Sequence, residues 1–359
     1  MDYLKDQIIT YIGNKRKILP FIERSLNQIG IKDYTFLDLF SGSGIVSRLA
    51  KAHGAKKIIA NDLEYYSMVL NSVFLRNEEG DKKEFEDLKQ DILSRPLFEG
   101  WVCENYAPKD DNNIQRGERC FYTRENALLI DSYIESLKGL PCEVAHMLIA
   151  PLIYEASVHT NTSGVFKGFY KNKQGIGQFG GEGKNALQRI CGKIDPQFPV
   201  FCPNETENII ISADASTVVN DTKIVEQAKG IDITYIDPPY NQHPYGSNYF
   251  MLNAIAENKC PKEISKVSGI PKDWNRSIYN KRVEGVMQLL KDIENVDSKY
   301  VLLSYSSEAY LPIKDMVAEL AKIGLITNLQ EIDYNVFRGS RNLSNRPKKL
   351  QEYLITIRK

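Results

Sequence analysis

Short apolar runs alternate with segments of helical periodicity over most of this 359-residue chain. Residues 35–40 (Thr-Phe-Leu-Asp-Leu-Phe) are typical of a buried strand, and residues 63–76 follow with apolar side chains at helical spacing. Further strands are predicted at residues 57–60, 208–211, 231–236, 300–303, 325–329 and 353–357. This alternation predicts an α/β fold with a mostly parallel, doubly wound sheet. A loop rather than a helix joins the last two strands, so we expect them to pair antiparallel at one edge.

The alternation lapses between residues 78 and 203. Helical segments at residues 124–137 and 142–159 stand among loops rich in Gly, Asn and Lys. We interpret residues 78–203 as a largely helical insertion into a sheet domain that is formed by residues 1–77 and 204–359.

The amino-acid composition argues against a metal-binding, disulfide-rich or membrane-spanning protein. Lys plus Arg and Asp plus Glu both number 46, so a surface for a polyanion must be a local patch. Six dispersed cysteines without a C-x-x-C pair, and only four histidines, predict neither a metal site nor a disulfide framework. The N-terminus lacks the features of a signal peptide, and the apolar run at residues 147–154 is too short for a bilayer. We therefore expect a soluble cytoplasmic protein.

One turn at the end of a predicted strand is suited to unusually specific chemistry. Asp237, Pro238, Pro239 and Tyr240 follow the apolar run 231–236. The prolines end the strand and stiffen the turn, which leaves a carboxylate and a carbonyl as acceptors beside an aromatic ring. Such a turn can stack a planar base while it accepts hydrogen bonds from an exocyclic amine. The alternative for these four residues alone is a surface turn with a capping Asp.

A glycine-rich turn follows the first predicted strand. Within residues 38–44 (Asp-Leu-Phe-Ser-Gly-Ser-Gly), Gly42 and Gly44 let the backbone pass close beneath a ligand, and the next helix offers free N–H groups. Asp62, at the end of the second strand, lies near the spacing expected for a carboxylate that binds a ribose diol. The pair indicates a nucleotide-like ligand. A structural turn with a helix cap and a nicotinamide-dependent oxidoreductase are the alternatives.

Residues 11–19 place an aromatic ring, a glycine and three cations before an apolar helical stretch. Taken alone, this pattern favours a basic amphipathic first helix. Together with the two turns described above, it favours a ligand site, in which Tyr11 packs on a cofactor and Lys15 pairs with the cofactor's carboxylate.

In chain order, these motifs resemble those of the Dam-like (alpha-class) DNA adenine-N6 methyltransferases, in particular the members of restriction-modification systems. The matching segments are residues 11–15, 40–44, 61–62, Asp214 in Ser-Ala-Asp, residues 237–240, their continuation at 245–253, and residues 334–339. The resemblance covers nearly the whole chain and is weakest over residues 78–203.

The resemblance implies a Rossmann-like methyltransferase domain with S-adenosylmethionine as cofactor and double-stranded DNA as partner. The implied cofactor contacts are Tyr11, Lys15, Asp38, Phe40, Gly42, Gly44, Asp62, Asp214 and Asp237. Asp62 is expected on the ribose hydroxyls and Asp214 near the adenine of the cofactor. The insertion corresponds to the target-recognition region of the family. Further expectations are a separate cognate restriction endonuclease and a monomer or weak dimer in a bacterial or archaeal cell.

The predicted reaction is methylation of an adenine that is flipped out of the duplex. Tyr240 is expected to stack on the base, while Asp237 and the Pro238 carbonyl accept its N–H groups. The predicted catalytic residues are therefore Asp237, Pro238, Pro239 and Tyr240. No cysteine has the Pro-Cys setting of cytosine-C5 methyltransferases. An RNA adenine-N6 methyltransferase and a catalytically silent DNA-binding protein are the alternatives.

Two basic stretches are predicted to contact DNA phosphates. The first interleaves cations with aromatic residues and glycines, and the second has no acid among its cations. A short segment past residue 240 is a candidate for holding the strand around the flipped base. The predicted DNA-binding residues are Lys167, Lys171, Lys173, Lys184, Arg189, Tyr245, Asn248, Arg338, Arg341 and Arg346. A solvated charged loop is the alternative for each stretch.

Overall fold

The computed structural model describes residues 2–10, 12–221, 224, 230–240, 242–335 and 349–359. The chain divides into two compact units, each described by itself. The sheet unit contains Asn14–Asn77, Phe201–Pro244 and Arg276–Lys359, and the helical unit contains Met1–Gly13, Glu78–Val200 and Tyr245–Asn275. Four predicted site residues lie outside the described residues, namely Tyr11, Arg338, Arg341 and Arg346.

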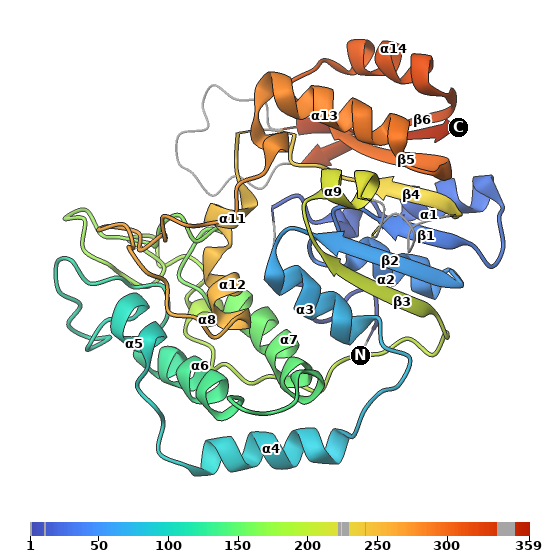
Figure 1. The fold of residues 1–359 in the computed structure, drawn as a ribbon. Helices are drawn as coiled ribbons and strands as arrows, with labels where there is room; N and C mark the ends of the chain where they lie inside the picture. Colours follow the sequence, from blue (N-terminus) through green and yellow to red (C-terminus); the bar gives the residue numbers. More distant parts are fainter. Residues whose placement is uncertain (1, 11, 222–223, 225–229, 241, 336–348) are drawn as a thin grey trace. The chain divides into compact units, whose positions relative to one another are not determined.

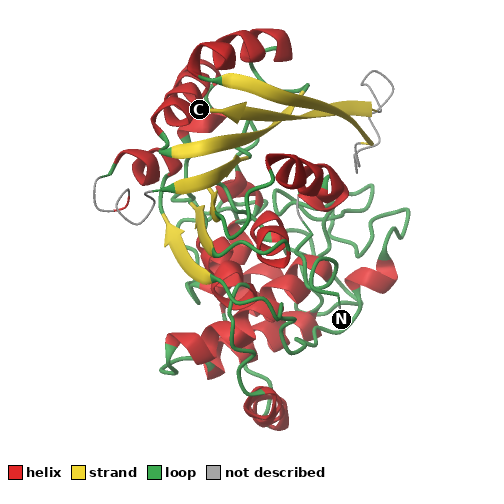
Figure 2. Ribbon diagram, turned by 90° about the vertical axis from the view of Figure 1, so that its right-hand side faces the viewer, coloured by secondary structure: helices red, strands yellow, loops and turns green. Residues whose placement is uncertain are grey.

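A seven-stranded sheet with the order β3-β2-β1-β4-β5-β7-β6 forms the centre of the sheet unit. Its strands are β1 (Thr35–Asp38), β2 (Lys57–Asp62), β3 (Glu207–Ser212), β4 (Ile231–Ile236), β5 (Ser298–Ser306), β6 (Leu325–Asn335) and β7 (Lys349–Arg358). Strands β1 to β5 pair in parallel, and β7 is antiparallel to both β5 and β6. The predicted α/β fold with an antiparallel edge is confirmed. Figure 2 shows the strands turning progressively across the sheet, which is the usual twist.

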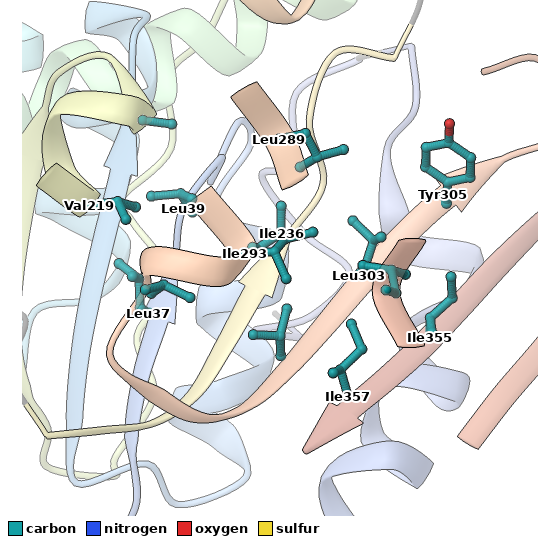
Figure 3. Close-up of a cluster of buried hydrophobic side chains, with 14 of the residues drawn as sticks. Leu37, Leu39, Val219, Ile236, Leu289, Ile293, Leu303, Tyr305, Ile355 and Ile357 are labelled. Atoms are coloured by element: carbon teal, nitrogen blue, oxygen red, sulfur yellow. The ribbon is translucent and has the colours of Figure 1, made fainter. Parts of the chain in front are cut away.

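Helices connect the strands and cover both faces of the sheet (Figure 1). They are η1 (Lys15–Lys17), α1 (Leu19–Ile29), α2 (Ile45–Ala52), α3 (Tyr65–Phe74), α9 (Ala215–Asn220), η2 (Ile278–Asn280), α13 (Arg282–Asn295) and α14 (Ile313–Ile323). Successive strand residues point to opposite faces. Leu37 therefore joins the apolar cluster that contains Val219 of α9 and Ile293 of α13 (Figure 3). The next residue, Asp38, points to the face that α2 covers and accepts a hydrogen bond from Ser47.

The strand order places the carboxyl ends of β1 and β4 where ligands usually bind. From β1, the chain runs outward through β2 and β3 on one side, whereas β4 and β5 lie on the other side. Open α/β sheets bind ligands at such a switch point, beyond the carboxyl ends of the strands. Asp38 ends β1, and Asp237 directly follows β4. The two carboxylates that the sequence analysis identified, Asp38 and Asp237, thus lie at the carboxyl ends of adjacent central strands.

The helical unit is held together by aromatic packing between segments far apart in the sequence. Its helices are α4 (Lys82–Ser94), α5 (Trp101–Tyr106), α6 (Arg124–Ser136), α7 (Cys142–Val158), α8 (Leu187–Ile190), α11 (Tyr245–Asn248) and α12 (Phe250–Ala256). The ring centroid of Phe250 lies 5.8 Å from that of Tyr106 and 6.3 Å from that of Phe166. Residues 245–275 therefore belong to this unit, although the sequence grouped them with the sheet domain. No helix among the described residues is long and apolar enough to cross a membrane.

The segment 78–200 leaves and rejoins the sheet unit at one junction. The buried Lys51 Nζ donates to the carbonyl oxygens of Leu75 (2.7 Å) and Arg76 (2.6 Å) and to Asn77 Oδ1 (3.0 Å). Asn77 Nδ2 donates to Thr206 O (2.9 Å), and Thr206 N donates back to Asn77 Oδ1 (3.0 Å). Burial lowers the pKa of Lys51 to about 8. A buried lysine thus closes the end of α3, and the Asn77–Thr206 hydrogen bonds join the two points where the segment leaves and re-enters the sheet unit.

Candidate active site

The Asp237 turn begins where β4 ends, and a buried lysine lies against it. Asp237 Oδ1 is 3.1 Å from Lys15 Nζ, and the side chain of Asp237 is 18% exposed. Lys15 is the first residue of η1, a short helix that Asn14 caps by accepting a hydrogen bond from Arg16 N (2.9 Å). The ammonium of Lys15 also lies 5.9 Å from the ring centroid of Tyr240. Lys15 and the Asp237 turn, far apart in sequence, thus meet in one site.

A second carboxylate shares the Lys15 ammonium. Glu352, on β7, accepts a hydrogen bond from Lys15 Nζ at 3.3 Å and is itself 5% exposed. The sequence analysis did not single out this residue. A signal was available, since the charged Glu352 shares one face of an apolar strand with Leu354 and Thr356. Buried acids in such a position are normally paired.

The ionisation of this cluster is set by burial and by mutual charge. Burial raises the pKa of Asp237 to about 6, against an opposing effect of Lys15. Burial alone would lower the pKa of Lys15, but its negative neighbours, Asp237 first, raise that pKa well above its ordinary value. Near neutral pH, the site therefore holds an ammonium and an ionised Asp237 in contact.

The glycine turn after β1 has the backbone conformation that only glycine adopts easily. Gly42 has φ +51° and Gly44 has φ +75°, both in the left-handed region. A Cβ on Gly44 would lie 2.8 Å from Asn71 Oδ1. Gly44 is also the residue that precedes the first turn of α2. The turn therefore packs tightly, and its two glycines place no side chain at the start of the helix.

Two carboxylates flank this turn. Asp62 Oδ2 accepts from Gly42 N (2.7 Å), and Asp62 Oδ1 accepts from Glu64 N (2.9 Å). Burial raises the pKa of Asp62 to about 6. Asp38 Oδ2 accepts from Ser47 Oγ (2.7 Å), while the buried Asp38 Oδ1 has no hydrogen-bond partner among the described residues. Burial raises the pKa of Asp38 to about 7. An acceptor oriented in this way suits a cationic ligand group.

Aromatic rings line the region around the Asp237 turn. The Phe40 ring meets Tyr279 edge-on at 4.9 Å between centroids, and the Tyr240 ring lies 6.3 Å from Tyr305. A small apolar hollow is lined by Pro238, Pro239, Tyr240, Tyr279, Gly285, Val286, Leu289, Tyr305 and Tyr310. Planar groups can stack on such surfaces.

Asp214 has a structural contact of its own. Its Oδ1 accepts hydrogen bonds from Ser216 N (3.0 Å) and from Ser216 Oγ (2.6 Å), so it caps the first turn of α9. Its predicted place near the adenine of a cofactor remains a prediction.

The predicted DNA-binding cations of the helical unit fall into two groups. Lys167, Lys173 and Lys184 are exposed, and Lys171 Nζ lies 4.8 Å from the ring centroid of Phe169. Arg189 instead donates to the carbonyl oxygens of Thr160 (2.9 Å) and Thr162 (3.2 Å), and also to that of Val158. The exposed lysines are available to phosphates, whereas the contacts of Arg189 clamp a loop of its own unit.

Two tyrosines that follow the turn form hydrogen bonds with Ile12 of the N-terminal motif. Tyr245 Oη donates to Ile12 O (3.2 Å), and Tyr249 Oη accepts from Ile12 N (2.6 Å). The two tyrosine rings stack with centroids 5.9 Å apart. Asn248 is buried, and its carbonyl accepts from Phe166 N (2.7 Å). These contacts all lie within the helical unit, and the predicted DNA contacts of Tyr245 and Asn248 remain predictions.

Comparisons with known proteins indicate the family to which this chain belongs. A family model described as D12 class N6 adenine-specific DNA methyltransferase matches residues 11–178 and 203–318. The type II methyltransferase M.CviAII of Paramecium bursaria Chlorella virus 1 is 31% identical over 97% of this chain and 98% of its own length. The type II methyltransferase M.NlaIII of Neisseria lactamica is 29% identical, with 98% and 99% covered. The modification methylase LlaI of Lactococcus lactis subsp. lactis is 28% identical over 97% of this chain and 55% of its own length.

The family match and the site coincide along the chain. The matched ranges contain Lys15, the glycine turn, Asp62 and the Asp237 turn. The strand order places the glycine turn and the Asp237 turn at adjacent central strands. Since the family model covers most of the chain, this protein belongs to the D12 class of N6 adenine-specific DNA methyltransferases.

Proposed function

We propose that this adenine-specific DNA methyltransferase uses the sheet-unit site to transfer a methyl group from S-adenosylmethionine to N6 of a flipped adenine. One observation carries the assignment of residues. Asp237 and Pro238 directly follow a central strand at the switch point of the sheet. The Asp237 carboxylate and the Pro238 carbonyl therefore lie in the turn that contains the Tyr240 ring, and the buried Lys15 contacts this turn. An exocyclic amine needs such a pair of acceptors, and a base needs such a ring.

The residues around the glycine turn fit the cofactor that methyltransferases generally use. S-adenosylmethionine carries an ammonium group, a ribose diol and an adenine, and when bound it supplies a methyl group on a positively charged sulfur. The buried Asp38 Oδ1, which has no partner among the described residues, suits the ammonium. The ribose hydroxyls suit Asp62, which belongs to the same turn through Gly42 N. Gly42 and Gly44 present no side chain that would obstruct the ligand.

The protein's part in the reaction is to orient and polarise the adenine amine. The lone pair of that nitrogen is delocalised into the ring, so the free amine is a poor nucleophile. Hydrogen bonds to Asp237 and to the Pro238 carbonyl favour a pyramidal nitrogen whose lone pair is directed at the methyl group. As the new N–C bond forms, positive charge develops on N6, and the fixed carboxylate of Asp237 stabilises it. The methyl group would leave its sulfur as the N–C bond forms, and one N6 proton would then pass to water, which leaves neutral N6-methyladenine and a neutral thioether.

The helical unit is proposed to bind the duplex. Its exposed lysines, Lys167, Lys173 and Lys184, suit phosphate contacts, and Lys171 extends the patch beside Phe169. The names of the relatives support a place in a type II restriction-modification system, with a separate endonuclease as counterpart.

A tritiated-methyl transfer assay on duplex DNA and on RNA of the same sequence tests the proposal. We expect label in duplex DNA only, recovered as N6-methyladenine after digestion. Sequencing of methylated positions in DNA from expressing cells then identifies the recognition sequence. Label in RNA, or at cytosine, would contradict the proposal.

A further inference from the structure

Three charged side chains from different parts of the sheet unit meet at the Asp237 turn. Lys15 of η1 lies 3.1 Å from Asp237 Oδ1 and 3.3 Å from Glu352 Oε2 of β7. The side chains of Lys15 and Glu352 are 6% and 7% exposed. We call these three residues the Lys15 cluster. It contains one ammonium and two carboxylates, and all three residues belong to the sheet unit.

The charge of Glu352 is not required to pair Lys15 with Asp237. Lys15 and Asp237 already form an ion pair at 3.1 Å, and burying another carboxylate costs desolvation free energy that a neutral side chain would avoid. The packing position itself does not demand an acid, since Leu354 and Thr356 occupy the same face of β7. Glu352 therefore has a use that concerns charge rather than volume.

We propose that Glu352 is a positioning residue for methyl transfer, which draws the Lys15 ammonium between two carboxylates and so leaves an Asp237 oxygen to the adenine amine. This inference rests on the proposed function, because it assumes that Asp237 receives the base. With Lys15 alone, the ammonium would bind Asp237 fully and compete with the amine. With Glu352 present, the ammonium is shared and its position is fixed from both sides.

The charges around Asp237 act on its pKa in opposite directions. The ionisable groups that face it are Lys15 from η1, Glu352 from β7, Asp38 from β1, Tyr235 from β4 and Tyr240 from the turn itself. After burial, which raises the pKa of Asp237, Lys15 lowers that pKa and Glu352 raises it. Loss of the Glu352 charge should therefore lower the pKa of Asp237.

The test compares Glu352→Gln with a matched control on the neighbouring strand. Glu331→Gln removes an exposed acid from β6, opposite Tyr353. For Glu352→Gln we expect kcat to fall about ten-fold while KM for duplex DNA is unchanged, because a positioned contact and not a binding contact is disturbed. The acid limb of the pH–rate profile should move down by about one pH unit, since a like charge within a few ångströms has been removed. Glu331→Gln should leave both quantities at wild-type values.

A conservative variant and a measurement without turnover complete the test. Glu352→Asp keeps the charge on a shorter arm, so its acid limb should stay near the wild-type position although its rate falls. A ¹³C NMR titration of the Asp237 carboxylate should show the same downward shift in Glu352→Gln. An Asp237 titration that is identical in wild type and Glu352→Gln would overturn the proposal. Absence of adenine methylation by the wild-type enzyme would contradict the proposed function instead, whereas an unchanged Asp237 titration beside an active wild-type enzyme would overturn only the role of Glu352.

Discussion

In the sheet unit the charged residues near the Asp237 turn are buried and paired, whereas in the helical unit most lysines predicted to meet DNA are exposed. Lys15 is 5% exposed and held by two carboxylates. Lys167, Lys173 and Lys184 lie on the surface. The first arrangement loses freedom on folding and keeps its geometry before any substrate arrives. The second keeps its hydration until a phosphate replaces it.

The difference indicates how the two units contribute to one reaction. Buried, fixed charges suit the chemical step, because their orientation is already set when charge develops on the substrate. Exposed lysines suit association with a polyanion, where each contact is weak and depends on salt. Mutations in the sheet unit should therefore act on kcat, and mutations of the exposed lysines on DNA affinity.

The largest expected effect is that of Asp237→Ala, which removes the carboxylate paired with Lys15. Methyl transfer should fall roughly a thousand-fold, since the variant has no fixed acceptor for the developing charge. Asp232→Asn is the matched control at the other end of β4, where Asp232 accepts a hydrogen bond from Thr35 N (2.9 Å). It should retain turnover. Near wild-type turnover by a folded Asp237→Ala variant, shown by circular dichroism and tritium transfer, would falsify the role of this residue.

Tyr240 should show a smaller effect that depends on its ring. Tyr240→Ala removes the stacking surface, which is worth about 1–3 kcal/mol per base, so productive base binding should weaken roughly ten- to hundred-fold. Tyr240→Phe keeps the ring and should be much milder. Fluorescence of 2-aminopurine at the target position reports base capture. Equal losses in both variants would assign the effect to the hydroxyl instead.

The pH dependence tests whether Asp237 must be ionised. Burial raises its pKa from 3.8 to about 6, so the rate should fall as the pH drops below about 6. The effect on stability has the opposite sign. Between pH 3.8 and about 6 the folded state binds more protons at this group than the unfolded state, so its contribution to the unfolding free energy decreases as the pH rises. Rate and melting temperature measured over this window should therefore change in opposite directions on account of Asp237.

The smallest expected effect distinguishes the two groups of cations in the helical unit. Changing the exposed Lys167, Lys173 and Lys184 to Gln should reduce the slope of log K against log salt by about 0.9 for each phosphate that is no longer neutralised. Arg189→Gln is the contrasting variant, since it breaks hydrogen bonds to Thr160 and Thr162 carbonyls. It should lower the melting temperature and leave the slope unchanged. A slope unaffected by the lysine changes would place the DNA-binding surface elsewhere.

Local patterns were sufficient for the sheet and for the residues that follow its strands. The seven strands were predictable because each is a short apolar run, and the Asp237 turn because its four residues are contiguous. The strand order is less local, since β7 lies between β5 and β6 although β6 comes first in the chain. Nothing in the hydrophobic pattern distinguishes that order from its alternatives.

Features that depend on distant contacts were not predictable in the same way. Glu352 and Lys15 are 337 positions apart, so no short motif joins them. Arginine is a residue type that often binds phosphate. The carbonyl groups to which Arg189 donates, however, belong to residues about 30 positions earlier. Residues 245–275 belong to the helical unit because of rings such as Phe250, whose partners lie far away in the sequence.

The helical unit contains chain segments from both sides of the Asp237 turn. This arrangement limits which segments such a protein can exchange with its relatives by recombination. Residues 78–200 enter and leave at the junction that Lys51, Asn77 and Thr206 hold together, which resembles a convenient pair of recombination breakpoints. A transplanted 78–200 segment would nevertheless meet a foreign Phe250 and the rest of 245–275. A functional chimera should therefore carry both segments from the same donor. In the evolution of such enzymes, these two stretches should be inherited together although the Asp237 turn separates them in the gene.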